Sequence, residues 1–381
     1  MLDASYGINS NALNNKLYTT VYEGGFIEDD LKLQQYDKLK KINRVGGDAN
    51  INTGVAFRLK NKKNNINYLG LTISQKYHYR AKFSDDLFKL ILSGNSIFIG
   101  NSAYFNQNSI NYLNYQQVNL NYTAIREKHS IKMGISYLKG VDFFNLNVKD
   151  GELYTNYNFT QLYLQTSYSI QLPDTSGTKK WSDFNGHGGA VNLSYSGRIS
   201  SSNSGNTFLN IAVSDLGLLV WNKNSLSARV DTAIKFKGIE LNNIFQLNDS
   251  NLTGLSTDSL KKSFLPLKKD RITILLPAWF DLSFKTFTRR NTSLQYGIKY
   301  RLMADYNLFG YIAMQHRFNK FISAGMGFSY GGYGVLNTSL ELKLCPFKNY
   351  ELLLQTNNLL SQLFPSSTFG QGLLVSMRYG F

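Results

Sequence analysis

Cysteine, proline and histidine are scarce in this chain. It has one cysteine, Cys345, five prolines and four histidines among 381 residues. A lone cysteine excludes a disulfide within the chain, and no two histidines have the spacing of a metal-binding pair. Because proline cannot donate to a strand ladder, its scarcity suits long strands. We therefore expect no metal ligands and no cofactor, and the shortage of proline favours extended structure.

Charged residues and long apolar runs are also few. Charged residues make up 17% of the chain, below the roughly 25% of typical soluble domains. No apolar run reaches roughly 18 residues, so no helix is expected to cross a bilayer. Aromatic residues, by contrast, reach 14%. Soluble domains and helical membrane proteins rarely combine these values, whereas strands that alternate apolar and polar residues produce them.

Positive charge exceeds negative charge by 41 − 25 = 16. Such an excess can indicate nucleic acid or an anionic membrane surface. The basic residues are scattered over expected turns, as in NKKNN at 61–65, and do not cluster with a recognition motif. The sequence therefore predicts no nucleic-acid partner.

Apolar and polar residues alternate with period two along most of the chain. The pattern is clearest in 117–125, 130–137, 294–302 and 336–344. Strands of this length suit a tilted membrane crossing and exceed the soluble average. Alternation alone is also compatible with a soluble sandwich, but the strand length, the few prolines and the aromatic residues toward strand ends favour lipid.

We therefore predict an all-β fold, a transmembrane antiparallel β-barrel of about 14 strands within a range of about 12 to 16. Residues 1–381 are expected to form one domain. Two stretches break the alternation and predict short helices near 26–43 and 84–93. The first has acidic residues at its start and lysines near its end, and the second has Ser84 and Gly94 as caps. Both either plug or cover the lumen or simply decorate loops.

Four charged residues share the polar phase of two predicted strands: Lys299, Arg301, Glu341 and Lys343. In a barrel this phase faces the lumen. If a solute binds or passes, these side chains would set the charge of its path. The alternative is that they only pair with one another and with water.

No pattern in the sequence predicts catalysis. His187 and His316 are candidates for a hydrolase in the barrel wall, but neither is accompanied by the strand-to-helix serine elbow that such an enzyme would use. We predict a non-enzymatic protein without catalytic residues, and a membrane-embedded hydrolase stays the less favoured alternative.

The final residues, GLLVSMRYGF, alternate to the end of the chain. We expect them to form a closing strand that pairs with the first strand and leaves no open edge. Met377, Tyr379 and Phe381 share one phase. This aromatic-tipped segment resembles the signal that barrel-assembly machinery recognises.

Several strings resemble one family over most of the chain. They are DLFKLILSGNSIFIG (86–100), VSDLGLLVWNKNS (213–225) and FSYGGYGVLNTSLELK (328–343). The family consists of Bacteroidota outer-membrane β-barrels of unknown function, distantly similar to FadL-type transporters and to PorV-type barrels of type IX secretion. Asp215, Gly217 and Trp221 in the second string resemble a structural turn with an interfacial tryptophan.

The resemblance implies a barrel in the bacterial outer membrane that binds or transports a hydrophobic small molecule. The alternative that it implies is an accessory or shuttle barrel of a membrane protein complex such as type IX secretion. Outer-membrane lipid, lipopolysaccharide and the barrel-assembly machinery are the implied partners. Members usually begin with a signal peptide and an Asn-Pro-Ala segment, neither of which is seen here. The signal peptide is expected to be cleaved or omitted, and a FadL-like hatch cannot be assigned.

Overall fold

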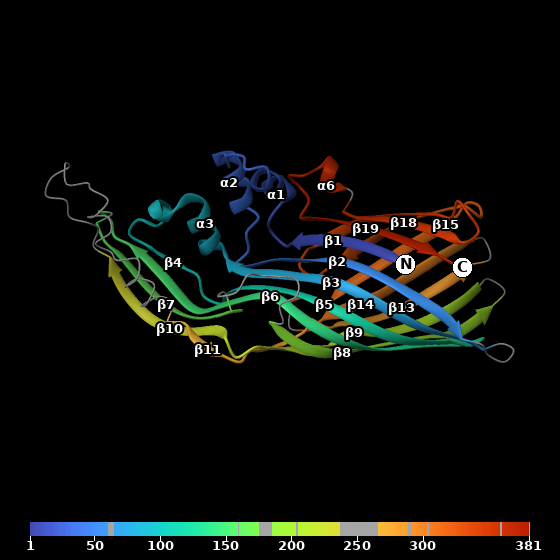
Figure 1. Ribbon diagram of the computed structural model, residues 1–381. Coiled ribbons are helices and arrows are strands. Elements are labelled where there is room, and N and C mark those ends of the chain that lie inside the picture. Colours follow the sequence, from blue (N-terminus) through green and yellow to red (C-terminus); the bar gives the residue numbers. More distant parts are fainter. Residues whose placement is uncertain are drawn as a thin grey trace.

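The chain folds into a long antiparallel barrel (Figure 1). The computed structural model describes residues 1–59, 65–158, 160–174, 185–202, 205–236, 266–288, 291–302, 305–358 and 360–380. Around the barrel, the strands of the closed circuit are β1 (Leu2–Ser10), β2 (Ile42–Leu59), β3 (Ile66–Ser84), β5 (Asn108–Ile125), β6 (His129–Thr155), β8 (Gly186–Ser202), β9 (Gly205–Trp221), β13 (Trp279–Thr288), β14 (Thr292–Arg301), β15 (Phe309–Arg317), β16 (Ile322–Tyr330), β17 (Leu336–Leu344), β18 (Tyr350–Asn357) and β19 (Gly370–Tyr379). β19 pairs with β1, so the circuit closes at 14 strands and the predicted barrel is confirmed.

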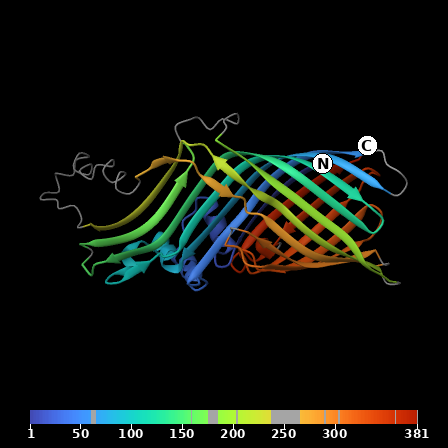
Figure 2. The same ribbon diagram turned by 90° about the horizontal axis from the view of Figure 1, so that it is seen from below.

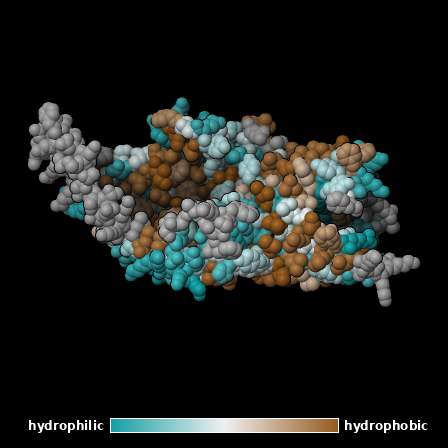
Figure 3. Space-filling view, in the orientation of Figure 1, coloured by the Kyte–Doolittle hydropathy of each residue, from teal (hydrophilic) through white to brown (hydrophobic). Residues whose placement is uncertain are grey.

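The alternation seen in the sequence separates the two faces of the wall. On β14, Tyr296, Ile298 and Tyr300 are each 43% exposed on the outside, whereas Arg301 is 1% exposed and points inward. Hydrophobic side chains cover much of the visible barrel in Figure 3, and hydrophilic ones gather at its right-hand end. An apolar outer face and a polar lumen are what a barrel in lipid requires. No helix among the described segments is long and apolar enough to span a membrane.

The two ends of the barrel differ in the length of their connections. At one end β5 is joined to β6 by residues 126–128, and β15 to β16 by 318–321. Both ends of the chain lie toward this end (Figure 1). At the other end the connections are long, as in 11–41 between β1 and β2 and 85–107 between β3 and β5.

Beyond the long-loop end, part of the wall continues as an extended sheet. β6 is 27 residues long, and its first half pairs with β8 while its second half pairs with β7 (Leu162–Leu172). β7 pairs in turn with β10 (Ser225–Phe236), which pairs with β11 (Lys268–Asp270). The short β4 (Ser102–Tyr104) pairs with the far end of β6, and β12 (Thr273–Leu275) pairs with β9. Figure 2 shows the green and yellow strands curving away from the orange and red ones.

Short helices lie in the long connections. They are α1 (Asn15–Tyr22), α2 (Asp29–Tyr36), α3 (Asp85–Ser93), the 3-10 turn η1 (Asn95–Phe98) and α6 (Leu360–Leu363). Ser84 caps α3 by accepting a hydrogen bond from Leu87 N, and Gly94 ends it at a φ of 70°. The helix expected over 26–43 is shorter, since α2 covers only Asp29–Tyr36, and residues from Ile42 onward belong to β2.

The helices cover the rim of the barrel from outside. Leu17 of α1, Leu31 of α2 and Phe88 of α3 form one buried cluster with Phe83 of β3. Phe83 shares the phase of Ile73, which faces outward and is 48% exposed. The helices therefore belong to the loops, and the lumen is filled by other residues.

Candidate functional site

An ion pair crosses the lumen between Arg301 and Asp48. Arg301 Nη1 lies 3.0 Å from Asp48 Oδ2, and Nη2 lies 2.6 Å from Oδ1. β2 and β14 are the second and ninth strands of the circuit, so they lie seven steps apart in either direction, on opposite walls. A bidentate arginine–carboxylate pair is strong and fixes both partners in orientation. This pair therefore ties opposite walls of the barrel together.

His78 of β3 completes a three-residue cluster with this ion pair. Its Nδ1 contacts Asp48 Oδ1 and lies 2.5 Å from Arg301 Nη2. Its Nε2 lies 3.3 Å from the hydroxyl of Tyr115, which is fully buried. The guanidinium of Arg301 also stacks on Trp279, 4.8 Å from the ring centre. The cluster is thus held by contacts from β2, β3, β5, β13 and β14.

A second ion pair lies nearby, between Lys76 of β3 and Asp215 of β9. Lys76 Nζ is 2.6 Å from Asp215 Oδ2, and Gln117 Nε2 donates to Oδ1 at 3.0 Å. Asp215 has a φ of 58°, beside a register shift between β8 and β9 at Val191/Leu193. A bulge of this kind re-aims a side chain. Here the bulge lies beside Asp215, whose carboxylate is inside the barrel.

An apolar cluster lies beside the charged residues. Trp221 is fully buried, with its ring centre 4.3 Å from that of Phe143. Ile272 and Leu276, from the segment between β11 and β13, are each 2% exposed and belong to the same cluster. A Cβ at Gly140 would come within 2.8 Å of the Trp221 ring, so glycine is needed there. Charged and apolar side chains together bridge the lumen at this level.

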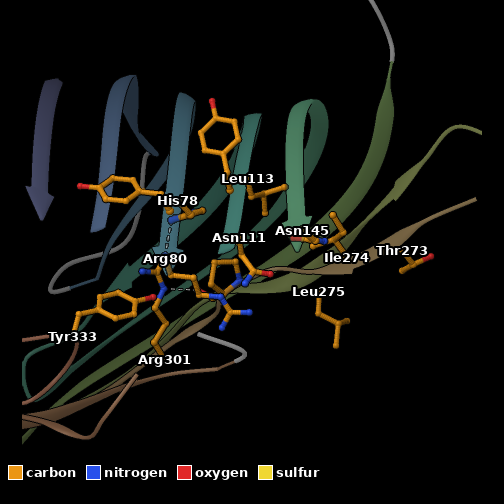
Figure 4. A pocket seen from close by; sticks show the side chains of 13 residues that line it. His78, Arg80, Asn111, Leu113, Asn145, Thr273, Ile274, Leu275, Arg301 and Tyr333 are labelled. Carbon is orange, nitrogen blue, oxygen red and sulfur yellow. Dashed lines mark hydrogen bonds between the residues drawn. The ribbon is translucent and has the colours of Figure 1, made fainter. Parts of the chain in front are cut away.

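A cavity of about 310 Å³ lies against this layer. Figure 4 shows Arg80, Arg301 and Tyr333 toward one end of it and Thr273, Ile274 and Leu275 toward the other. His78, Asn111, Leu113 and Asn145 line it as well. One part of the cavity can therefore contact apolar surface while the other offers hydrogen bonds and positive charge, as in typical small-molecule sites.

The four predicted lumen charges lie on the inward face, but only one of them borders the cavity. Arg301 belongs to the cross-lumen cluster. Lys299 lies 3.4 Å from Asp281, Glu341 accepts a hydrogen bond from Gln315 at 2.7 Å, and Lys343 lies 2.6 Å from Glu351. All three have local partners, and those of Glu341 and Lys343 lie nearer the short-turn end.

Sequence reasoning missed Asp48, His78 and Lys76. Asp48 and His78 are opposite each other in the β2–β3 register, so the two strand patterns with a correctly placed turn could have paired them. Nothing local in the sequence marks their contact with Arg301, which is 253 residues from Asp48.

The interpretation of Asp215, Gly217 and Trp221 as a turn with an interfacial tryptophan is wrong. All three lie within β9, and Trp221 is buried inside the barrel. Gly217 allows close strand packing, since a Cβ there would lie 2.1 Å from Gly189 O. The local spacing therefore reflects a bulged strand whose polar and aromatic side chains fill the lumen.

The remaining predicted residues lie elsewhere on the barrel. His187 is exposed on β8, and His316 shares a hydrogen bond with Thr292 Oγ1 at 2.9 Å. Met377 and Tyr379 of β19 are 40% and 58% exposed. Phe381 lies outside the described residues.

Neither a metal-ligand group nor a serine elbow is assembled in the part of the chain that the structure describes. No group of three or more metal-ligating side chains occurs there. The string GFSYG at 327–331 has the spacing of a serine elbow, but Ser329 lies within β16, which leads into a hairpin and not into a helix.

The fold and this lumen define a closed transmembrane β-barrel whose interior is bridged by side chains. The chain belongs to the family of unknown function DUF5723, which matches residues 1–351. No curated protein matches the chain.

Solved barrels resemble the chain only in outline. The toluene transporter TbuX of Ralstonia pickettii matches at a TM-score of 0.44 and 6% identity, covering 100% of this chain and 88% of that one. The toluene transporter TodX of P. putida matches at 0.41 and 9%, covering 100% and 88%. The β domain of the Bordetella autotransporter BrkA matches at 0.31 and 8%, covering 100% and 98%. Likeness at this level carries no conclusion about ligands.

Proposed function

We propose that this chain is a non-enzymatic barrel of the bacterial outer membrane that binds a hydrophobic small molecule and passes it inward. The observation that carries the proposal is the cavity of about 310 Å³ against the bridged lumen. Its volume is in the range of small-molecule sites, and Leu113, Ile274 and Leu275 supply apolar contact area. A ligand there would lie against Arg301, which lines the cavity and pairs with Asp48.

The orientation follows from the two ends of the barrel. Outer-membrane barrels have short periplasmic turns and longer extracellular loops. The long connections, the helices and the extended sheet would then lie on the cell surface. The cavity would open toward the outside, and the charged residues Glu341 and Lys343 would line the periplasmic half.

Passage through this barrel requires the lumen layer to rearrange. Arg301 and Asp48 join opposite walls, and Lys76 and Asp215 join β3 to β9. A ligand can shift such an arrangement only if it binds the open form better than the closed one. The proposal therefore separates binding at the cavity, which needs no opening, from transfer, which does.

Binding can be tested with the uncharged fluorophore N-phenyl-1-naphthylamine and the barrel in lipid nanodiscs. Leu275→Gln places a polar group at the cavity and should weaken the saturable binding at least about tenfold, a loss of roughly 1.4 kcal/mol. Leu308→Gln is the matched control, because Leu308 is 57% exposed in a loop at the same end and does not line the cavity. Equal saturable binding by the two variants would rule out the cavity as the site.

A second candidate function is an accessory barrel in a membrane protein complex. It is favoured by two exposed aromatic residues, Tyr22 at the end of α1 with 93% exposure and Phe26 between α1 and α2 with 83%. Exposed apolar groups gathered on one surface often mark contact sites. Cross-linking in native membranes, compared between the wild type and the double variant Tyr22→Ser/Phe26→Ser, tests this candidate. Unchanged cross-linked products would exclude this surface.

A further inference from the structure

A row of polar side chains crosses the extended sheet on its lumen-side face. The strand registers place Lys82 opposite Ser109, Ser109 opposite Asn147, Asn147 opposite Ser169, and Ser169 opposite Arg229. Residues directly opposite in antiparallel strands share one face. The row therefore spans β3, β5, β6, β7 and β10, about 19 Å at roughly 4.8 Å per strand.

A second polar row lies next to the first, one step closer to the lumen. It consists of Arg80, Asn111, Asn145, Gln171 and Ser227. Arg80, Asn111 and Asn145 also line the lumen cavity. A separate cavity of about 560 Å³ is lined by all five residues of the first row, Lys82, Ser109, Asn147, Ser169 and Arg229. The polar face is thus a groove that leads to the lumen.

The opposite face of the same strands is apolar. The row behind the groove is formed by Ala81, Ile110, Leu146, Ile170 and Ala228. Ile110 is 46% exposed on that face. The extended sheet therefore has one apolar face and one polar face. Its polar side chains lie on the face that continues into the lumen.

Two buried groups, one in each polar row, have unused hydrogen-bonding capacity. Ser109 is 8% exposed, and its Oγ is buried without a partner. The Nδ2 of Asn111 in the neighbouring row is likewise buried without a partner. A buried polar group left unpaired costs about 1–3 kcal/mol. Both can donate a hydrogen bond, so they fit a ligand that carries acceptor oxygens.

The charges in the groove favour an anion. Lys82, Lys149 and Arg229 line it and have no ion-pair partner among the described residues. The acids that line it are Asp231 and Asp305, and Asp305 lies 3.5 Å from Arg80. Three cations and two carboxylates therefore line the groove, and one of the carboxylates, Asp305, lies beside Arg80 of the neighbouring row.

We propose that this groove binds a phosphorylated saccharide. Lysine and arginine bind phosphate oxygens through charge-assisted hydrogen bonds. Serine hydroxyls and asparagine amides between them can each donate and accept, as sugar hydroxyls require. The same chemistry occurs in the headgroup of lipopolysaccharide and in free sugar phosphates. The inference does not depend on the hydrophobic ligand proposed for the lumen cavity.

The test uses the full barrel in phosphatidylcholine nanodiscs and isothermal titration calorimetry. The probes are the phosphorylated oligosaccharide of deacylated lipopolysaccharide, the same oligosaccharide after phosphatase treatment, and inorganic phosphate alone. A further arm uses intact lipopolysaccharide in the nanodisc. The phosphorylated oligosaccharide should bind at least tenfold tighter than either of the other soluble probes, because only it engages both the cations and the amides.

Variants locate the site. Lys82→Gln/Arg229→Gln should lower the affinity for the phosphorylated probe tenfold or more. Arg317→Gln/Lys320→Gln removes the same charge at the opposite end of the barrel and should leave the affinity unchanged. Ser109→Ala should weaken binding without lowering resistance to urea, since it removes a hydroxyl that has no partner in the fold.

Each outcome decides for or against the groove. Binding of the soluble phosphorylated oligosaccharide assigns a free ligand, and binding of intact lipopolysaccharide alone, lost in Lys82→Gln/Arg229→Gln, assigns its headgroup. Equal binding before and after phosphatase treatment would overturn the proposal, as would equally tight binding of inorganic phosphate. Equal losses in the two double variants would reduce the effect to net charge and also refute the site.

Discussion

Arg301 on β14 and Asp48 on β2 form a two-point ion pair between opposite walls of a 14-strand barrel. Neighbouring strands are held by backbone hydrogen bonds, but these two strands are connected only through their side chains and the intervening walls. Arg301 is 1% exposed, so solvent screens the pair little. The pair thus acts as a cross-brace and as a barrier in the lumen.

Arg301→Gln should both destabilise and open the barrel. It leaves Asp48 without its charged partner in the barrel interior, and breaking a buried pair in this way costs about 3–5 kcal/mol. Urea unfolding, followed by heat-modifiable migration on gels, measures the loss. Single-channel conductance in planar bilayers should rise in the same variant, because the side chain that crosses the lumen is shortened and uncharged.

Lys299→Gln is the matched control for this prediction. Lys299 lies two residues away on the same strand, is 41% exposed and is 3.4 Å from Asp281. Removing such a pair costs about 1 kcal/mol or less. If Lys299→Gln raises conductance as much as Arg301→Gln does, the barrier in the lumen does not depend on the cross-brace.

Lys76 and Asp215 should behave as a coupled pair. Asp215→Asn keeps the side-chain shape but leaves Lys76 with a weaker partner, while Gln117 can still donate to the remaining oxygen. We expect a coupling energy of about 0.5–3 kcal/mol between Asp215→Asn and Lys76→Met in a double-mutant cycle of urea unfolding. Additive effects of the two changes would show that the contact contributes nothing to stability.

Trp221→Ala should cost about 3–5 kcal/mol of unfolding free energy, because it empties a fully buried site against Phe143. Trp221→Phe retains part of that packing and should cost less. Urea unfolding of both variants measures the difference. A loss below 1 kcal/mol for the alanine variant would mean that water or neighbouring side chains fill the site, and the apolar cluster would then not contribute to closing the lumen.

The sequence predicts the barrel wall well because each strand carries its own signal. In β14, alternating residues from Leu294 to Arg301 already separate an apolar face from a polar one. The inward phase of Lys299, Arg301, Glu341 and Lys343 follows from the same periodicity. One face of each strand must meet lipid, so the constraint is local and repeats in every crossing.

The site could not be predicted because its contacts depend on how the wall curves. Arg301 reaches Asp48 only because seven strand steps bring β14 opposite β2. The branching of β6, which pairs with β8 and then with β7, is equally hidden, since both halves of the strand alternate in the same way. Trp221 illustrates the limit of local motifs, because an aromatic residue near a strand end was expected at the membrane interface and is buried in the lumen instead.

The closing contact between the first and last strands can be tested by cross-linking. Ala4 of β1 lies directly opposite Val375 of β19. In a Cys345→Ser background, which removes the free cysteine, Ala4→Cys/Val375→Cys should form a disulfide, because opposite residues of antiparallel strands are about 4.5–5.5 Å apart at Cα. The cross-linked chain should migrate differently from the reduced chain on denaturing gels.

The matched control is Ala4→Cys/Leu342→Cys, since Leu342 lies three strand steps from Ala4, about 14 Å away, and cannot be bridged without moving the backbone. Efficient cross-linking in the control, or none in the first pair, would mean that the barrel closes in a different register, and a slip of one residue would turn the polar face of β19 toward lipid.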